Sequence, residues 1–283
     1  MCIRDRAYSS VVPELPEVET IRTQLTPQLE GAVIVDSGAH WSEKFAPAVE
    51  ATGAEIVGIR RRGKYLLFDL DTGAPYELVV HLGMTGRLAV HTVDQPPERS
   101  HPHLRAWWAL ADGRTLTFHD VRRFGRIHVV PTGRHETIPT LHRLGPEPWD
   151  EAFNGRALAR FVQRSDRHLK TILLSQRAVA GVGNIYADEA LWMAEINPAI
   201  RRLSPTRAER LVATVRSALA AGLRNGGTTL RDYVDGQGEA GANQHQLSCY
   251  GRAGEACPRC STWLRRRVLD ARTTTYCPRC QAR

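Results

Sequence analysis

A proline followed by a glutamate stands near the start of the chain, at Pro13 and Glu14. The nitrogen of a proline at a chain terminus is a secondary amine, which can attack a sugar carbon as a nucleophile. Inside a chain the same nitrogen belongs to a tertiary amide and is inert. A neighbouring carboxylate is a group that can move protons in such a reaction. The chemistry open to this chain therefore depends on whether residues 1–12 precede Pro13 in the working molecule.

Four cysteines near the C-terminus form two C-x2-C pairs, Cys257 with Cys260 and Cys277 with Cys280, separated by sixteen residues. This spacing lies in the range of four-thiolate zinc sites. Disulfides or redox motifs are the alternatives, and a chain without a secretory signal favours the metal. The residues between the pairs are long enough for a β-hairpin. Because so short a tail cannot build its own core, the metal would supply its folding free energy.

The chain is basic, with a formal net charge of +8 and a pI near 9.5. Residues 257–283 contain seven arginines and one acid, Asp270, so most of the positive charge lies in this tail. Concentrated positive charge favours a polyanionic partner such as nucleic acid. Only three basic residues are lysines: Lys44, Lys64 and Lys170. A lysine retained among so many arginines indicates a task that arginine cannot perform, such as giving up a proton.

The length of 283 residues fits two domains. No run approaches the roughly eighteen apolar residues of a membrane helix, and residues 1–12 lack the apolar stretch of a secretory signal. We therefore expect a soluble, cytoplasmic protein with no membrane association.

The apolar pattern changes twice along the chain. Apolar residues at helical spacing after Pro16 predict an early amphipathic helix that ends before Gly31. Residues 33–130 show short strands, with hairpins predicted from 65–70 with 78–82 and from 104–110 with 116–118. These strands predict an antiparallel sandwich or barrel.

The second half of the chain is predicted to be helical. Residues 131–149 are rich in proline, glycine and histidine and predict a linker. Helices are expected at 157–164, 171–176, 184–194 and 205–225, with a short one after Thr228. The expected layout is a β domain, a helical domain and a zinc hairpin.

Several separated motifs occur in a fixed order from Pro13 to the C-terminus. They are PELPEVET at 13–20, GKYLL at 63–67, HLGMTG at 81–86, RRFG at 122–125, GVGNIY at 181–186, GGTTL at 226–230 and the terminal cysteines. In this order they resemble the formamidopyrimidine-DNA glycosylase family. The resemblance implies an α+β multidomain protein with an N-terminal antiparallel β-sandwich, a helix-two-turn-helix domain and a C-terminal zinc β-hairpin.

The resemblance also implies where the domains lie. Residues 13–130 would form the catalytic β-sandwich domain with its N-terminal helix, and 131–149 the linker. Residues 150–248 would form the helical DNA-binding domain with a lesion loop, and 249–283 the zinc-finger hairpin. Residues 1–12 are expected to be a non-native or mispredicted extension, because every other catalytic position of the family is present.

The implied activity is that of a bifunctional DNA glycosylase and AP lyase in base-excision repair. It would flip and excise oxidised purines, namely 8-oxoguanine and formamidopyrimidines, and then cleave the abasic strand by β,δ-elimination. The expected partner is double-stranded DNA that contains oxidised bases. One structural Zn²⁺ and no organic cofactor are expected. The protein is expected to be a monomer. We also expect it to lie in the bacterial cytoplasm and to be associated with the nucleoid when bound to DNA.

The family's catalytic roles fall on four residues. By resemblance, Pro13 is the nucleophile, Glu14 the proton shuttle, Lys64 a proton donor in β-elimination and Arg272 a phosphate contact that acts in δ-elimination. Other interpretations stay open for most of them. Glu14 and Glu17 could cap the helix N-terminus, which is the preferred interpretation for Glu19. Lys64 could clamp a phosphate, and Arg272 could be one more surface charge.

The family's DNA contacts fall on further residues. By resemblance, Met84, Arg122 and Phe124 wedge into the duplex, and Arg122 reads the base opposite the lesion. Core packing is the alternative for Met84 and Phe124. The remaining expected DNA contacts are His81, His103, Lys170 and Asn184.

The loop 235–248 departs from the family pattern. An aromatic family segment, Gly-Tyr-Phe, appears here as Gly-Ala-Asn at 241–243. Because that loop caps the flipped base, the preference between 8-oxoguanine and ring-opened purines stays open. Two other functions also stay open: an oxidised-pyrimidine glycosylase of the endonuclease VIII type, and a non-catalytic DNA-binding protein if residues 1–12 are retained.

Overall fold

The structure is a computed structural model that describes residues 12–230 and 233–282. These residues divide into two compact units. Val12–Arg143 and Leu223–Ala242 form one, here called the sheet unit. Leu144–Gly222 and residues 243–282 form the other, here called the helical unit. The expected extension at residues 1–12 lies, apart from Val12, outside the described residues.

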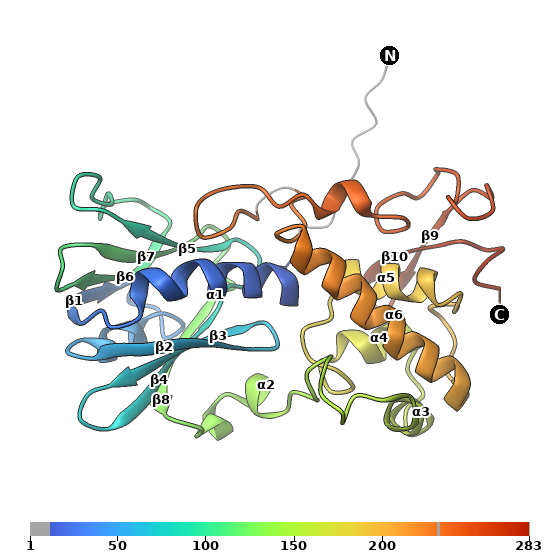
Figure 1. The fold of residues 1–283 in the computed structure, drawn as a ribbon, viewed down its shortest axis with the longest axis horizontal. Helices are drawn as coiled ribbons and strands as arrows, with labels where there is room; N and C mark the ends of the chain where they lie inside the picture. Colours follow the sequence, from blue (N-terminus) through green and yellow to red (C-terminus); the bar gives the residue numbers. More distant parts are fainter. Residues whose placement is uncertain (1–11, 231–232, 283) are drawn as a thin grey trace, which may run out of the picture. The chain divides into compact units, whose positions relative to one another are not determined.

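Two four-stranded antiparallel sheets make up most of the sheet unit (Figure 1). The strands are β1 Ile34–Ala39, β2 Glu55–Arg62, β3 Tyr65–Asp71, β4 Pro75–His81, β5 Gly86–His91, β6 Leu104–Leu110, β7 Thr115–Asp120 and β8 Arg126–Pro131. One sheet has the order β2-β3-β4-β8 and the other has the order β1-β6-β7-β5. The predicted antiparallel sandwich is confirmed.

Both predicted hairpins are confirmed. β3 pairs with β4 from Tyr65 opposite His81 to Asp71 opposite Pro75. At their turn, the Asp71 carboxylate accepts the Gly73 N–H at 2.8 Å, and Gly73 has φ +88°. A positive φ suits glycine because it has no Cβ, so the sequence at this turn fixes where the strand reverses.

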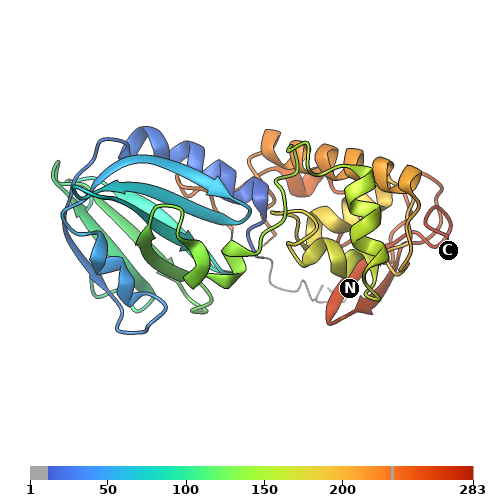
Figure 2. The same ribbon diagram turned by 90° about the horizontal axis from the view of Figure 1, so that it is seen from below.

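The helix α1, Leu15–Leu29, contacts β2 and β3 of one sheet and β5 of the other (Figures 1 and 2). Its side chains Val18, Ile21 and Leu25 are fully buried in the core shared by both sheets. Trp108 is also buried there, and its indole N–H donates to the carbonyl of Ala48 at 2.9 Å in the 3-10 helix η1, Ala46–Ala51. Each such side chain stabilises the fold by about 1.5–3 kcal/mol, so α1 is firmly fixed.

The predicted linker at 131–149 contains two short helices, η2 His135–Thr137 and α2 Pro139–His142. The Tyr65 hydroxyl donates to the Thr140 hydroxyl at 2.7 Å, which holds α2 against the start of β3. Much of this segment therefore packs on the sheet unit.

The helical unit contains the predicted helices, each within two residues of its expected ends. Its elements are α3 Gly155–Gln163, α4 Leu169–Leu174, α5 Asn184–Met193, α6 Pro205–Arg224, the 3-10 helix η3 Asn243–Gln246 and the strands β9 Arg265–Leu269 and β10 Arg272–Tyr276. β9 and β10 pair as the predicted hairpin.

The short helix predicted after Thr228 is wrong for residues 228–230 and 233–242, which form no helix. The reason is tertiary contact. The Thr228 N–H donates to the Glu17 carboxylate at 2.7 Å, and the Thr229 hydroxyl accepts the Gly241 N–H at 2.9 Å. These bonds hold the segment against α1 in an irregular conformation. Among the described residues, no helix has the length and apolar character needed to cross a bilayer.

Candidate functional site

The start of α1 carries the Pro13–Glu14 pair. Pro13 is buried and Glu14 is 1% exposed. Glu14 is the N-cap, and its side chain accepts the backbone N–H of Glu17, while its own N–H donates to the Glu17 carboxylate at 2.9 Å. This capping box satisfies two N–H groups that a helix start leaves without partners. The capping interpretation of Glu14 and Glu17 is therefore confirmed.

Glu17 also connects α1 to Thr228 and Tyr233. One carboxylate oxygen accepts the Glu14 N–H and the other accepts the Thr228 N–H at 2.7 Å. The Tyr233 hydroxyl donates to the carbonyl of Glu17 at 3.3 Å, and burial raises the pKa of Tyr233 well above its usual range. Sequence reasoning missed this bridging role, because Thr228 lies 211 residues away in the chain.

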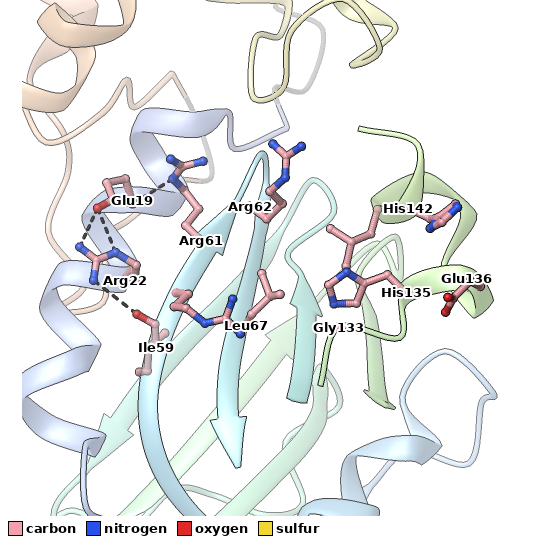
Figure 3. A pocket seen from close by; sticks show the side chains of 12 residues that line it. Glu19, Arg22, Ile59, Arg61, Arg62, Leu67, Gly133, His135, Glu136 and His142 are labelled. Carbon is pink, nitrogen blue, oxygen red and sulfur yellow. Dashed lines mark hydrogen bonds and ion pairs between the residues drawn. The ribbon is translucent and has the colours of Figure 1, made fainter. Parts of the chain in front are cut away.

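The expectation that Glu19 caps the helix is wrong. Its carboxylate instead pairs with Arg22 at 2.7 Å and with Arg61 of β2 at 2.9 Å (Figure 3). These side chains line a pocket of about 580 Å³ together with Arg60, which is bonded to Asp69. Most of the positive charge here is thus already balanced by carboxylates. The ion pair between Glu19 and Arg61 connects α1 to the end of β2, beside the β2–β3 turn.

That turn carries Lys64. Gly63 has φ +57°, which allows the tight reversal between β2 and β3. His81, opposite Tyr65 in the neighbouring strand, has a pKa lowered to about 4 by burial and by the positive charges of Lys64 and Arg126. Lys64 and His81 are therefore neighbours, and His81 is neutral at pH 7. Its Nδ1 accepts the Gly83 N–H at 3.1 Å, so its remaining proton is on Nε2.

Met84 and the segment 121–125, here called the wedge loop, lie side by side. A Cβ on Gly83 would collide with the backbone of Phe124 and Gly125, so glycine is required for this contact. Arg122 lies 4.9 Å from the centre of the Phe124 ring, as a cation–π pair. Phe124 is 48% exposed, which excludes core packing for it, while Met84 is half-buried.

Asp120 fixes this arrangement and was not identified from the sequence. It is fully buried, and its two oxygens accept the Thr85 hydroxyl at 2.5 Å and the Gly125 N–H at 2.7 Å. The Thr85 hydroxyl in turn accepts the Arg122 N–H at 3.0 Å. One carboxylate therefore holds both the Met84 turn and the wedge loop.

His103 is bonded to Asp120, whose backbone N–H donates to the His103 carbonyl at 2.9 Å. It lines a cavity of about 930 Å³ together with Thr85, Val121 and residues 234–238. The cavity extends along α1 to Gln24 and Gln28. Gln24 follows Pro13 by eleven residues, or about 16 Å at 1.5 Å per residue. The cavity therefore leads away from the Pro13–Glu14 end of α1.

In the helical unit, Asn184 begins α5. It follows Gly181, whose φ is +84°, and Gly183, the N-cap. The buried side-chain oxygen of Asn184 has no hydrogen-bond partner among the described residues. The N-terminus of α5 is suited to an anionic ligand because the first N–H groups of a helix have no partner within it. The Asn184 side-chain nitrogen is a further possible donor there, whereas its oxygen can only accept.

Arg272 is the first residue of β10, and it is exposed. The preceding turn, Asp270–Ala271, has two positive φ values, as a two-residue hairpin turn requires. The Thr171 hydroxyl of α4 donates to the Asp270 carboxylate at 2.5 Å. On the other side, Lys170 donates to the carbonyl of Thr273 at 2.9 Å. Arg272 therefore projects from a turn that α4 anchors on both sides.

Lys170 is not a DNA contact in this structure, which corrects the sequence expectation. It is fully buried, and its ammonium contacts the Asp188 carboxylate at 2.7 Å, the Thr274 hydroxyl at 3.0 Å and the Thr273 carbonyl. Asp188 also accepts the Thr275 N–H at 2.9 Å. Burial raises the pKa of Asp188, and the Lys170 ammonium opposes that shift. A buried, fully engaged ammonium cannot reach a phosphate, so Lys170 positions the hairpin.

The sulfur atoms of the four cysteines Cys257, Cys260, Cys277 and Cys280 lie within 4.8 Å of one another. Zinc–sulfur bonds of about 2.3 Å in a tetrahedron place the sulfurs about 3.8 Å apart, so the donor set fits Zn²⁺. The sulfurs of Cys260 and Cys277 are 3.5 Å apart and all four thiols are free, which excludes the disulfide alternative. The Trp192 indole donates to the Cys257 sulfur at 3.4 Å and joins the cluster to α5.

Comparison with known families agrees with this architecture. The formamidopyrimidine-DNA glycosylase N-terminal domain matches residues 12–127, the H2TH domain of the same family matches 144–234, and the zinc finger found in FPG and IleRS matches 254–283. The chain belongs to the formamidopyrimidine-DNA glycosylase family.

Individual relatives are similar over almost the whole chain. The formamidopyrimidine-DNA glycosylase of Geobacillus kaustophilus is 42% identical over 95% of this chain and 100% of its own length. A Lactococcus lactis FPG variant bound to Fapy-dG-containing DNA is 34% identical, with a TM-score of 0.86, covering 96% of this chain and 100% of that one. A MutM structure with DNA that contains carbocyclic 8-oxo-G is also 34% identical, with a TM-score of 0.84 and the same coverage.

Asp120→Ala should destabilise the sheet unit and weaken DNA binding. It leaves the Gly125 N–H buried without an acceptor, at a cost of about 1–3 kcal/mol. Asp120→Asn keeps an acceptor for Gly125 and should retain most of both properties. Urea unfolding and titration of a damaged duplex measure the two effects, and equal behaviour of both variants would contradict the role given to Asp120.

Lys170→Met should destabilise the helical unit by about 3–5 kcal/mol, because Asp188 stays buried without a counter-charge. The double variant Lys170→Met/Asp188→Asn should recover part of this loss, since no buried charge remains. Asp166→Asn, which breaks an exposed pair with Arg202, is the control and should change the free energy of unfolding by less than about 1 kcal/mol. If Lys170→Met behaved like this control in urea unfolding, the positioning role would be wrong.

Cys257→Ser should abolish zinc binding and lower the melting temperature, because the hairpin has only a small core beside the metal. Cys249→Ala is the matched control: Cys249 is also buried, but it lies outside the cluster. Metal content by mass spectrometry should be one zinc per chain in the control and none in Cys257→Ser. Retention of zinc by Cys257→Ser would show that the four thiolates are not the site.

Proposed function

We propose that this chain excises oxidised purines from double-stranded DNA and then cleaves the abasic strand by β,δ-elimination. The observation that carries the proposal is the Pro13–Glu14 pair at the N-terminus of α1, in a chain of this family. The relatives that are bound to Fapy-dG and 8-oxo-G DNA support oxidised purines as the substrate class.

The proposed nucleophile is the amine of Pro13, which must be free. Its attack on the deoxyribose C1′ breaks the bond to the base, which leaves with a proton, and the amine gives up its own proton. The C1′–O4′ bond of the sugar ring then opens as O4′ takes a proton, which leaves an iminium between Pro13 and C1′. The iminium acidifies the adjacent C2′ proton, whose loss expels the 3′ phosphate, and a second elimination expels the 5′ phosphate. The positive end of α1 begins two residues after Pro13 and disfavours the protonated amine, which keeps more of it nucleophilic.

Side chains on both units are proposed to serve these steps. Glu14 shuttles protons beside the amine, and Lys64 donates a proton in β-elimination from the turn that β2 and β3 hold. Asn184 and Arg272 bind phosphates of the damaged strand, and Arg272 acts in δ-elimination.

The wedge loop is proposed to stabilise the flipped base pair. Met84 and Phe124 present apolar surface, and Arg122 adds donors for the base left without a partner. His81 is neutral and accepts the Gly83 N–H at Nδ1, so its Nε2–H is the atom proposed to donate to the DNA backbone. His103 is proposed as a further contact at the edge of this surface.

The remaining expectations are kept as part of the proposal. One zinc ion is structural and no organic cofactor is needed, because the amine and carboxylate supply the chemistry. The protein acts as a monomer in the cytoplasm, on nucleoid DNA. Domains at 13–130, 150–248 and 249–283, with the 131–149 linker between the first two, are the proposed functional divisions.

Borohydride trapping tests the nucleophile. A chain that begins at Pro13 should form a covalent adduct with an 8-oxoguanine:cytosine duplex, because borohydride reduces the iminium to a stable amine. The full chain is the matched control. Its Pro13 nitrogen is an amide, so the full chain should bind the duplex without forming the adduct. Equal trapping by both chains would show that Pro13 is not the nucleophile.

The same assay separates lesion classes. Faster trapping on an oxidised pyrimidine than on 8-oxoguanine would overturn the purine assignment and favour activity of the endonuclease VIII type. Comparing 8-oxoguanine with a formamidopyrimidine then shows which oxidised purine is preferred by this chain, whose loop at 235–248 departs from the family pattern.

A further inference from the structure

Trp41 is 84% exposed, the largest exposed fraction among the large hydrophobic side chains that the structure shows on the surface. A tryptophan in water forgoes the burial of a large apolar surface. Tryptophan is one of the residue types enriched among the side chains that contribute most to binding interfaces. Trp41 has no part in the catalytic and DNA-binding roles described so far.

The ring of Trp41 packs on a histidine that in turn contacts the core. It stacks on His40 with ring centres 5.1 Å apart and planes at 29°. His40 meets the edge of Phe45, which is fully buried, at 6.3 Å. The Ser42 N–H donates to Nδ1 of His40 at 3.2 Å, which fixes the His40 ring. Trp41 is therefore held on a platform that is anchored in the core, so little conformational freedom is lost when it binds.

The segment that carries this platform, residues 40–45, is bonded to the wedge loop through Lys44. The Lys44 ammonium donates to the carbonyl of Arg123 at 2.9 Å, and the Ile127 N–H donates to the carbonyl of Lys44 at 2.8 Å. Trp41 is three residues before Lys44, so their Cα atoms are at most about 10 Å apart. The extended lysine side chain adds about 6 Å and the hydrogen bond 2.9 Å, so the Trp41 backbone lies at most about 19 Å from the Arg123 carbonyl. At about 3.4 Å per base along one strand, this bound corresponds to about six bases.

The surroundings of Trp41 are positively charged. Lys44, Arg122 and Arg123 lie on or beside the wedge loop, and Glu43 is the acid in the segment 40–45. Burial, together with the charges of Arg123 and Arg105, lowers the pKa of His40. A single aromatic ring among cations suits a polyanion with exposed flat rings better than an apolar protein surface.

We propose that Trp41 is a second aromatic contact to DNA, which packs against the strand that the wedge loop opens, within about six bases of the wedge. Insertion of a wedge unstacks neighbouring bases and exposes their faces and sugars. The Trp41 ring covers that surface and so strengthens the binding of kinked, damaged duplex. This inference rests on the proposed function, because it requires the wedge loop to enter DNA.

Fluorescence anisotropy on a duplex with a tetrahydrofuran abasic-site analogue tests the contact, with the full chain as the protein. Trp41→Ala should raise Kd at least about 5-fold, because loss of one base–aromatic stack is worth about 1–3 kcal/mol. The dependence of Kd on salt should not change, since no charge is removed. Trp41→Phe should restore most of the affinity, and Trp41→Leu should not.

Two controls make the result specific. Trp149→Ala removes a tryptophan that is 46% exposed in the helical unit and should leave Kd within about 2-fold of the original value. Hydroxyl-radical footprinting should show that Trp41→Ala loses protection only within about six bases of the wedge, with the unfolding midpoint unchanged.

The possible failures are distinguishable. If the unaltered chain did not prefer damaged duplex, the proposed function would fall and the Trp41 contact with it. If that chain bound as expected and Trp41→Ala bound within 2-fold of it, only the Trp41 inference would be overturned. Full rescue by Trp41→Leu would also overturn it, because apolar bulk rather than ring stacking would then explain the affinity.

Discussion

Buried carboxylates that accept backbone N–H groups hold four functional segments of this chain. Glu17 holds the start of α1 and Thr228, and Asp120 holds the wedge loop through Gly125. Asp188 holds β10 through the Thr275 N–H. Glu189 accepts three successive N–H groups, those of residues 248–250, at the entry to the zinc finger. Each carboxylate is at most 7% exposed. Of the residues that would meet DNA, Arg122 and Phe124 project from the wedge loop that Asp120 holds, and Arg272 from the strand that Asp188 holds.

A carboxylate suits this task for an energetic reason. An irregular loop leaves N–H groups without the partners that a helix or strand supplies, and each one buried unpaired costs about 1–3 kcal/mol. A carboxylate can accept several such groups at once through charge-assisted hydrogen bonds. Its own burial is unfavourable, so it is stable only where those donors, or an ammonium such as that of Lys170, surround it. The loop and the acid therefore stabilise each other.

This dependence explains what the sequence could predict. The sandwich hairpins, α1 and the cysteine cluster follow from local patterns: alternating strands, helical spacing and the spacing of two C-x2-C pairs. The side chains at loop tips, such as Arg122 and Phe124, were identified by their motif. The roles of Asp120 and Asp188 were missed, because their partners, Thr85 and Thr275, lie 35 and 87 residues away. No local pattern records such a pair.

Lys170 shows the same limit from the opposite side. Lys170 was expected to contact DNA because its position resembles a DNA contact of the family. The ion pair with the buried Asp188 shows instead that it is a structural residue. Glu19 was likewise expected at a helix cap, but its carboxylate forms an ion pair with Arg61 of β2 instead. In each case a charged residue follows its strongest partner, and that partner is set by tertiary structure. A lysine or glutamate motif therefore identifies a DNA or catalytic contact only once the buried charges near it have been located.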